Sequence, residues 1–245
     1  AAGSGYPTGR APGSRTPFFS SSERSAPGGE HVASGLIFWD VDTQHDFMDG
    51  SGKLYVPDAE SIKPNLKRLT DYAHERGIRI VATADDHEPG HRELSSTPDF
   101  RETFPEHCMR GTPGASKILE TALSAPVVVE PAPTPREQLT RLLHTRDGDI
   151  LIRKHWFDVF TNPNTDVVIE ALAPTDVIVY GVALDVCNRY AIEGLLARGI
   201  PRIHAVTDAT RPIHAEVAEE LLDSWRERGV RLVTTRQVVT GTAAC

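Results

Sequence analysis

The sequence has no apolar run that approaches the roughly 18 residues needed to span a bilayer, and no charged-then-apolar leader opens it. No basic run is interleaved with aromatic residues, so a nucleic-acid partner is not expected. Cysteine is scarce: Cys108, Cys187 and Cys245 are odd in number and widely spaced, unlike a disulfide framework or a four-cysteine zinc site. These absences predict a cytoplasmic protein without a membrane or nucleic-acid partner.

The composition is that of an acidic globular protein. There are 34 Asp and Glu against 26 Lys and Arg, which gives a net charge of −8. With 245 residues and 39% apolar content, the chain suits one domain with a sizeable core and a flexible end. Because residues 1–32 are rich in Gly, Ser, Pro and Arg, we expect a disordered tail there, a domain over residues 33–240 and a short tail over residues 241–245.

Apolar runs alternate with amphipathic stretches from residue 34 onwards. The runs that predict strands cover residues 35–41, 78–84, 150–153, 177–182, 202–206 and 230–234. A helix is predicted to begin after Ser61, which places Pro64 in its first turn, and to end at Gly77. A later helix has Trp225 on its apolar face, whereas residues 85–149 form a long irregular stretch. This alternation predicts a mostly parallel, Rossmann-like sheet covered on both faces, a three-layer α/β/α domain.

Polar residues follow the predicted strands at the points where they end. They are Asp40, Asp42, Gln44 and Asp46 after the first strand, Asp85, Asp86 and His87 after the second, Lys154 after the third, and Cys187 after the fourth. Because the carboxyl ends of parallel strands meet at one edge of a sheet, we expect these side chains to converge there.

Three of these residues are suited to nucleophilic catalysis. Cys187 stands at a predicted helix N-terminus, where unpaired N–H groups and the helix dipole favour the nucleophilic thiolate. Asp42 is a candidate general base, and Lys154 is a candidate cation that stabilises the thiolate and orients Asp42. Taken singly, Cys187 also fits a small buried apolar residue, Asp42 a turn-forming acid and Lys154 a solvated strand end. Their predicted convergence favours the catalytic interpretation.

A second group has the composition of a metal site. One carboxylate and three imidazoles, from Asp85, His87, His91 and His107, are suitable ligands for zinc, iron or manganese. Asp85 and His87 are two residues apart, so their side chains can point the same way from an extended chain. Surface or capping roles are the alternative for isolated histidines of this kind.

The chain resembles the isochorismatase-like cysteine hydrolases over about residues 34–240, and it is most similar to the nicotinamidases and pyrazinamidases among them. The motifs that carry the resemblance are Asp42 to Phe47 (DTQHDF), Asp85-Asp86-His87 with His107-Cys108 and GTPGA, Lys154 after its strand, and GVALDVC around Cys187.

The resemblance implies a hydrolase of linear amide C–N bonds. Asp42 would deprotonate Cys187, Lys154 would stabilise the pair, and the thiolate would attack an amide carbonyl to release ammonia before water hydrolyses the thioester. The implied oxyanion hole consists of the backbone N–H groups of Ala183 and Cys187, with a cis peptide bond between Val182 and Ala183. Homo-oligomers, either dimers or larger rings, are also common in the family.

The resemblance further implies a divalent metal held by Asp85, His87 and His107, with Zn²⁺ the first expectation and Fe²⁺ or Mn²⁺ the alternatives. The metal would bind the pyridine nitrogen of nicotinamide. The implied substrate-binding residues are Phe47 and Phe104, which would flank the ring, and Val182.

Two departures from the family pattern affect this metal site and pocket. Phe104 stands where many nicotinamidases have tryptophan, and the loop from His87 to His91 is shorter than in close relatives. His91 is therefore a provisional fourth ligand, with an acid such as Glu93, or water, as the alternative.

The main alternative keeps the same triad but changes the substrate. It is a metal-independent amidase of the same superfamily that acts on a carbamoyl, ureido or other small amide. Isochorismate cleavage is disfavoured, because true isochorismatases usually lack the cysteine that Cys187 supplies here. An NAD-binding domain is disfavoured as well, because no G-x-G-x-x-G follows the first strand. A non-catalytic binding module would not need a base, a lysine and a cysteine together.

Overall fold

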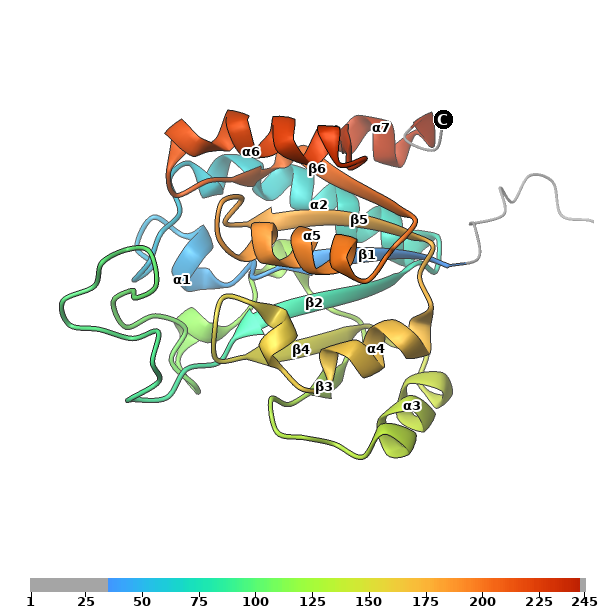
Figure 1. Ribbon diagram of the computed structural model, residues 1–245, viewed down its shortest axis with the longest axis horizontal. Coiled ribbons are helices and arrows are strands. Elements are labelled where there is room, and N and C mark those ends of the chain that lie inside the picture. Colours follow the sequence, from blue (N-terminus) through green and yellow to red (C-terminus); the bar gives the residue numbers. More distant parts are fainter. Residues whose placement is uncertain (1–34, 243–245) are drawn as a thin grey trace, which may run out of the picture. The chain divides into compact units, whose positions relative to one another are not determined.

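The structure, a computed structural model, describes residues 35–242 (Figure 1). The predicted disordered tail, residues 1–32, lies outside this range, as do residues 243–245 of the predicted C-terminal tail. No helix in the described range is long and apolar enough to cross a membrane.

A seven-stranded sheet forms the centre of the described domain. Its strands are β1 (Leu36–Val41), β2 (Arg79–Asp85), β3 (Val127–Val129), β4 (Ile150–Lys154), β5 (Asp176–Val182), β6 (Arg202–Arg211) and β7 (Arg231–Val233). Their order is β3-β4-β2-β1-β5-β6-β7, and every neighbouring pair is parallel. The order reverses direction at β1, so β1 and its neighbours β2 and β5 mark the switch point where such sheets bind ligands.

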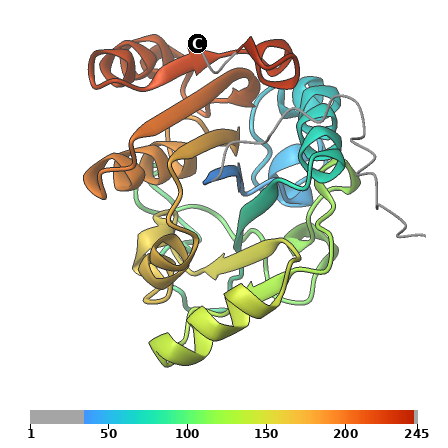
Figure 2. The ribbon, with the colours of Figure 1, turned by 90° about the vertical axis from the view of Figure 1, so that its right-hand side faces the viewer.

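Helices cover both faces of the sheet. They are α1 (His45–Met48), α2 (Ala59–Glu75), α3 (Arg136–Thr145), α4 (Thr165–Leu172), α5 (Cys187–Ala197), α6 (Ala215–Glu227) and α7 (Thr235–Val239), with 3₁₀ turns at Pro113–Ala115, Leu119–Thr121 and Val159–Thr161. Figure 2 shows α2 and α7 on one face and α4, α5 and α6 on the other. The predicted three-layer α/β/α architecture is confirmed.

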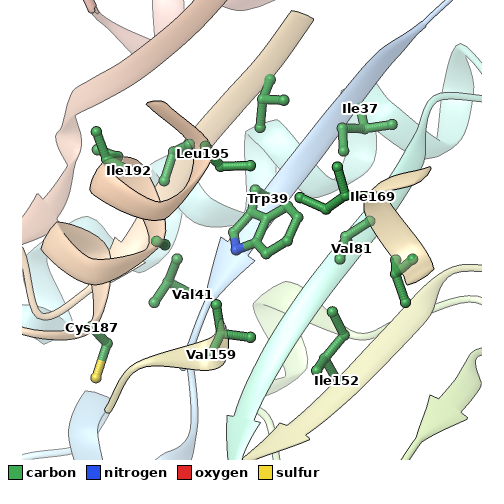
Figure 3. Close-up of a cluster of buried hydrophobic side chains, with 14 of the residues drawn as sticks. Ile37, Trp39, Val41, Val81, Ile152, Val159, Ile169, Cys187, Ile192 and Leu195 are labelled. Atoms are coloured by element: carbon green, nitrogen blue, oxygen red, sulfur yellow. The ribbon is translucent and has the colours of Figure 1, made fainter. Parts of the chain in front are cut away.

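The side chains of β1 point alternately to the two faces of the sheet and contribute to two separate core clusters. Ile37, Trp39 and Val41 are buried on the face that α4 and α5 cover, and Figure 3 shows them with Cys187 in the same apolar cluster. Phe38 is buried on the opposite face, where it packs with α2. Because both faces of β1 are covered, its sequence is an almost continuous apolar run rather than an alternating one.

The prediction for the start of α2 was wrong. The helix begins at Ala59, so Ser61 lies inside its first turn and donates its hydroxyl to the Asp58 carbonyl oxygen at 2.8 Å. Pro64 therefore lies inside the helix, where its missing N–H leaves the Glu60 carbonyl without the usual donor. Burial of Ala59 extends the apolar face of the helix upstream and favours the earlier start.

The stretch 85–149, predicted to be irregular, contains both β3 and α3. β3 is only three residues long and pairs at the edge of the sheet with β4, which gives it too little pattern to be detected. α3 begins directly after Pro135 and buries only Leu139 and Leu143. The predicted end of α2 is confirmed, because Gly77 follows its last turn with a left-handed φ of 64°.

Candidate active site

The candidate base Asp42 lies at the carboxyl end of β1 in the centre of the sheet. It is fully buried and has a left-handed φ of 47°. Its Oδ1 accepts a hydrogen bond from the Thr83 hydroxyl at 2.6 Å, and its Oδ2 lies 2.8 Å from Lys154 Nζ. Both carboxylate oxygens are therefore held in fixed directions.

Lys154 joins the candidate base to the candidate nucleophile. It is the last residue of β4, where it is paired in register with Asp85 of β2. Its ammonium forms ion pairs with both Asp42 and Asp85, and its Nζ lies 3.8 Å from Cys187 Sγ. A buried ammonium between two buried carboxylates offsets the desolvation of all three groups.

Cys187 is the first residue of α5, as the sequence predicted. The chain reaches it from β5 through a cis peptide bond between Val182 and Ala183. Within residues 35–242, the backbone N–H groups of Ala183 and Cys187 have no hydrogen-bond acceptor. The carboxylate of Asp185 accepts the N–H groups of Ile213 and His214 at 2.8 Å each and thereby ties this loop to the end of β6. Two unpaired donors beside a thiol have the composition of an oxyanion hole.

The electrostatics of the triad favour a neutral thiol beside a basic carboxylate. Burial raises the pKa of Asp42, Lys154 opposes this effect, and Asp85 adds to it. Burial also raises the pKa of the Cys187 thiol well above its ordinary value, with Lys154 again opposing. Burial alone would lower the pKa of Lys154, but Asp42 and Asp85 outweigh it and keep this side chain charged. A base of raised pKa is better matched to removing a thiol proton.

A second buried group has the composition of a metal site. Asp85, His87, Glu93 and His107 each offer one ligand atom, and these atoms all lie within 4.8 Å of one another. His107 Nε2 is 3.6 Å from Asp85 Oδ2 and 3.5 Å from Glu93 Oε1. Each of the four side chains has an inward-facing atom without a hydrogen-bond partner in the described part of the chain. Buried, unpaired donors and carboxylates of this kind fit a divalent cation.

Neighbouring contacts orient the candidate ligands. His107 Nδ1 lies 2.7 Å from the Pro105 carbonyl oxygen, which can only accept, so this nitrogen carries a proton and Nε2 is the ring nitrogen that faces Asp85 and Glu93. The Gln44 side chain donates to the Asp85 carbonyl and accepts the Asp85 N–H, both at 2.8 Å. The Asp46 carboxylate accepts the N–H of Cys108, the residue after His107, at 2.7 Å.

The charges of the candidate ligands interact strongly. Burial lowers the pKa of His87 to about 4, so its imidazole is neutral, as a metal ligand must be. Burial would also lower the pKa of His107, but Asp85 and Glu93 outweigh it and raise the pKa to about 10. Burial and the Asp85 charge both raise the pKa of Glu93. A cation at the centre would relieve the repulsion between the two carboxylates.

The structure does not bring His91 into this group. Its Nδ1 instead accepts the backbone N–H of Glu88 at 3.2 Å, and its ring packs on His155 with centroids 4.1 Å apart. Glu93, the alternative that the sequence offered, contributes the fourth ligand atom. The short loop after His87 therefore carries His91 past the centre and places Glu93 there.

A small cavity lies between the candidate triad and the candidate ligands. The predicted substrate-binding residues Phe47, Phe104 and Val182 line it, together with Glu93 and Cys187. The cavity has a free volume of about 20 Å³, which is enough for about one water molecule. A ring can therefore enter only if the lining side chains move. Phe47 and Phe104 both pack against His107, at centroid distances of 5.3 and 6.3 Å.

Sequence reasoning missed two sets of contacts near the carboxyl end of β1. Thr83 lies two residues before the end of β2, within an apolar run that gives no sign of a functional hydroxyl. The second set is a buried ion pair between Asp40 and Lys117, whose Nζ is 2.8 Å from Asp40 Oδ2 and 2.6 Å from Thr43 Oγ1. Asp40 lies near the end of β1, where the sequence places polar residues, but its partner Lys117 lies in a distant loop that no local pattern connects to it.

Comparison with known proteins agrees with this geometry. A family model described as the isochorismatase domain matches residues 34–237. The chain is 30% identical over 200 residues to the nicotinamidase/pyrazinamidase of Mycobacterium tuberculosis, a match that covers 79% of this chain and 95% of that relative. It is 23% identical over 199 residues to a probable inactive nicotinamidase of Arabidopsis thaliana, covering 80% of this chain and 91% of the relative.

Among solved structures, the pyrazinamidase of Pyrococcus horikoshii in complex with zinc superimposes with a TM-score of 0.63 at 25% identity, covering 82% of this chain and 99% of that chain. The chain therefore belongs to the isochorismatase domain family, in which it lies close to the nicotinamidases.

Proposed function

We propose that the protein is a metal-assisted cysteine amidohydrolase that converts nicotinamide, and similar pyridine or pyrazine carboxamides, to the acid and ammonia. Its family and its nicotinamidase relatives make it a hydrolase acting on amide bonds. The observation that carries the finer proposal is the double contact of Lys154, which pairs with the candidate base Asp42 and with Asp85, a candidate metal ligand. Thiol and metal group therefore meet in one cavity.

The triad accounts for the transfer of the acyl group. Asp42 takes the Sγ proton of Cys187 as sulfur bonds to the amide carbonyl carbon, and the N–H groups of Ala183 and Cys187 receive the developing oxyanion. Collapse of this intermediate breaks the C–N bond, and Asp42 returns the proton to the departing ammonia. Water then attacks the thioester and gives a proton to Asp42, and cleavage of the C–S bond restores the thiol.

The metal group accounts for the ring specificity that we propose. A divalent cation, with Zn²⁺ the first candidate, would be held by Asp85, His87, Glu93 and His107, and would supply a Lewis acid for the ring nitrogen of the substrate. Phe47 and Phe104 would then lie against the faces of the ring. NAD salvage, a cytoplasmic location and homo-oligomeric assembly stay predictions from the sequence.

The small cavity favours one alternative function. A free volume of about 20 Å³ admits neither kind of substrate without movement of the lining side chains, but a carbamoyl, ureido or other small amide requires a smaller movement than a pyridine ring. Such a reaction would use the same Asp42, Lys154 and Cys187 without a metal.

Ammonia release distinguishes these two functions. The purified protein is assayed with nicotinamide and with small aliphatic or carbamoyl amides, before and after metal chelation, with Cys187→Ala as the blank. We expect nicotinamide hydrolysis that chelation abolishes and added Zn²⁺ restores. Hydrolysis of small amides alone, unaffected by the chelator, would instead establish the metal-independent amidase.

A further inference from the structure

A tight turn determines the position of His91. Pro89 and Gly90 occupy its two central positions, and Gly90 has a φ of +91°, the pattern of a type II turn. The His91 N–H donates to the Glu88 carbonyl at 3.2 Å, which closes the turn. Glu88 donates its own N–H back to His91 Nδ1, also at 3.2 Å. The sequence Glu-Pro-Gly-His therefore folds the imidazole back over its own turn.

The hydrogen bonds of this turn fix the tautomer of His91 and favour one tautomer of His87. A backbone N–H can only donate, so His91 Nδ1 must be unprotonated where Glu88 donates to it. His87 Nδ1 lies 3.4 Å from the same nitrogen, and a hydrogen bond between them requires the proton to be on His87, which then shares the His91 lone pair with the Glu88 N–H in a three-centre hydrogen bond. Protonation at Nδ1 leaves the lone pair of His87 on Nε2. This Nε2 lies 4.0 Å from carboxylate oxygens of both Asp85 and Glu93, at the centre of the candidate metal group.

His91 is also supported from its other side. Its ring packs on that of His155 with centroids 4.1 Å apart and planes inclined by 37°. His155 directly follows Lys154, so the support is anchored to the end of β4. His91 is therefore held between the candidate ligand His87 and the strand that carries the triad lysine.

We propose that His91 is a positioning residue that accepts a hydrogen bond from His87 Nδ1–H and so directs His87 Nε2 toward the metal. This inference rests on the proposed metal-assisted function. It gives His91 a role that differs from direct ligation, and it makes the Pro89–Gly90 turn part of the metal site. Partners of this kind orient ligating histidines and make them more basic.

The test measures Zn²⁺ affinity by competition with a chromophoric chelator. His91→Ala removes the acceptor and should weaken Zn²⁺ binding by about 10- to 100-fold, the usual effect of losing such a partner. His91→Asn places its Oδ1 close to the position of Nδ1, so it should keep most of the wild-type affinity. His144→Ala, which removes an exposed histidine of α3, is the matched control and should leave the affinity unchanged.

The outcomes separate this inference from the proposed function. If the wild type binds Zn²⁺ and His91→Ala binds it equally well, the positioning role is refuted and the metal-assisted function stands. If His91→Asn loses as much affinity as His91→Ala, the imidazole itself is needed, and His91 acts as a ligand instead. If the wild type binds no Zn²⁺, both proposals are overturned. Thermal unfolding of each apoprotein shows whether a variant has lost its fold rather than its metal.

Discussion

Replacement of Thr83 by valine should shift the acid limb of the activity profile to higher pH. Valine has the shape of threonine but lacks the hydroxyl that donates to Asp42 Oδ1 at 2.6 Å. The hydrogen bond favours the charged form of the carboxylate, so its loss favours the protonated form and raises the pKa of Asp42 further. Burial already raises that pKa. Because the proposed base acts only when ionised, activity should be lost at a higher pH in the variant.

The size of the shift follows from the strength of the lost hydrogen bond. A hydrogen bond to a charged group contributes about 1.5–3 kcal/mol, and one pKa unit corresponds to about 1.4 kcal/mol. The acid limb of kcat/KM should therefore move upward by about 1–2 pH units. Because Asp42 and Cys187 interact closely, this limb reports the pair rather than the carboxyl group alone.

The assay is ammonia release from nicotinamide at saturating Zn²⁺ over a range of pH. Thr83→Ser keeps the hydroxyl and is the matched control, so its acid limb should remain close to that of the wild type. If the acid limb of the pH profile does not move in Thr83→Val, or moves equally in both variants, the assignment of Asp42 as a base held by Thr83 is refuted.

Two further predictions concern the scaffold around the site. Lys117→Met leaves the buried Asp40 carboxylate without its cation and should lower the free energy of unfolding by about 3–5 kcal/mol. Addition of Asp40→Asn should recover part of this loss, as measured by urea titration. If the losses of the two single variants simply add in the double variant, the pairing is contradicted. Gly114→Ala would place a Cβ 2.3 Å from the Asp46 carboxylate and should cost about 1–3 kcal/mol. Gly50→Ala, whose Cβ would be no closer than 3.6 Å to any neighbour, is the control and should change stability by less than about 0.5 kcal/mol. Urea titration compares the two glycine variants, and equal losses would exclude the steric explanation.

The fold was largely predictable because its central strands are buried on both faces. β1 and β5 have long apolar runs, and their order with intervening helices restricts the sheet to parallel topologies. β3 was not predictable, because three valines at a sheet edge do not form a distinguishable pattern. The position of Pro64 favoured a late start for α2, whereas burial of Ala59 favours the earlier one.

The candidate site was predictable where residues directly follow strands. Asp42, Lys154 and Cys187 converge because parallel strands end at one edge of the sheet. Whether His91 or Glu93 supplies the fourth ligand atom depends on a turn within an irregular loop. The alternation of side chains that predicts directions along a strand does not apply in such a loop. Contacts such as that of Thr83 with Asp42 join residues 41 positions apart, and only the register of the sheet reveals them.

The most direct test of the proposed chemistry is the intact mass of the protein after acid quenching during turnover of nicotinamide. The thioester mechanism predicts an added nicotinoyl group that proteolysis locates on Cys187. This adduct should be absent from Cys187→Ala and retained in Cys245→Ala. Release of ammonia without any acyl adduct, or with an adduct on another residue, would contradict the assignment of Cys187 as the nucleophile.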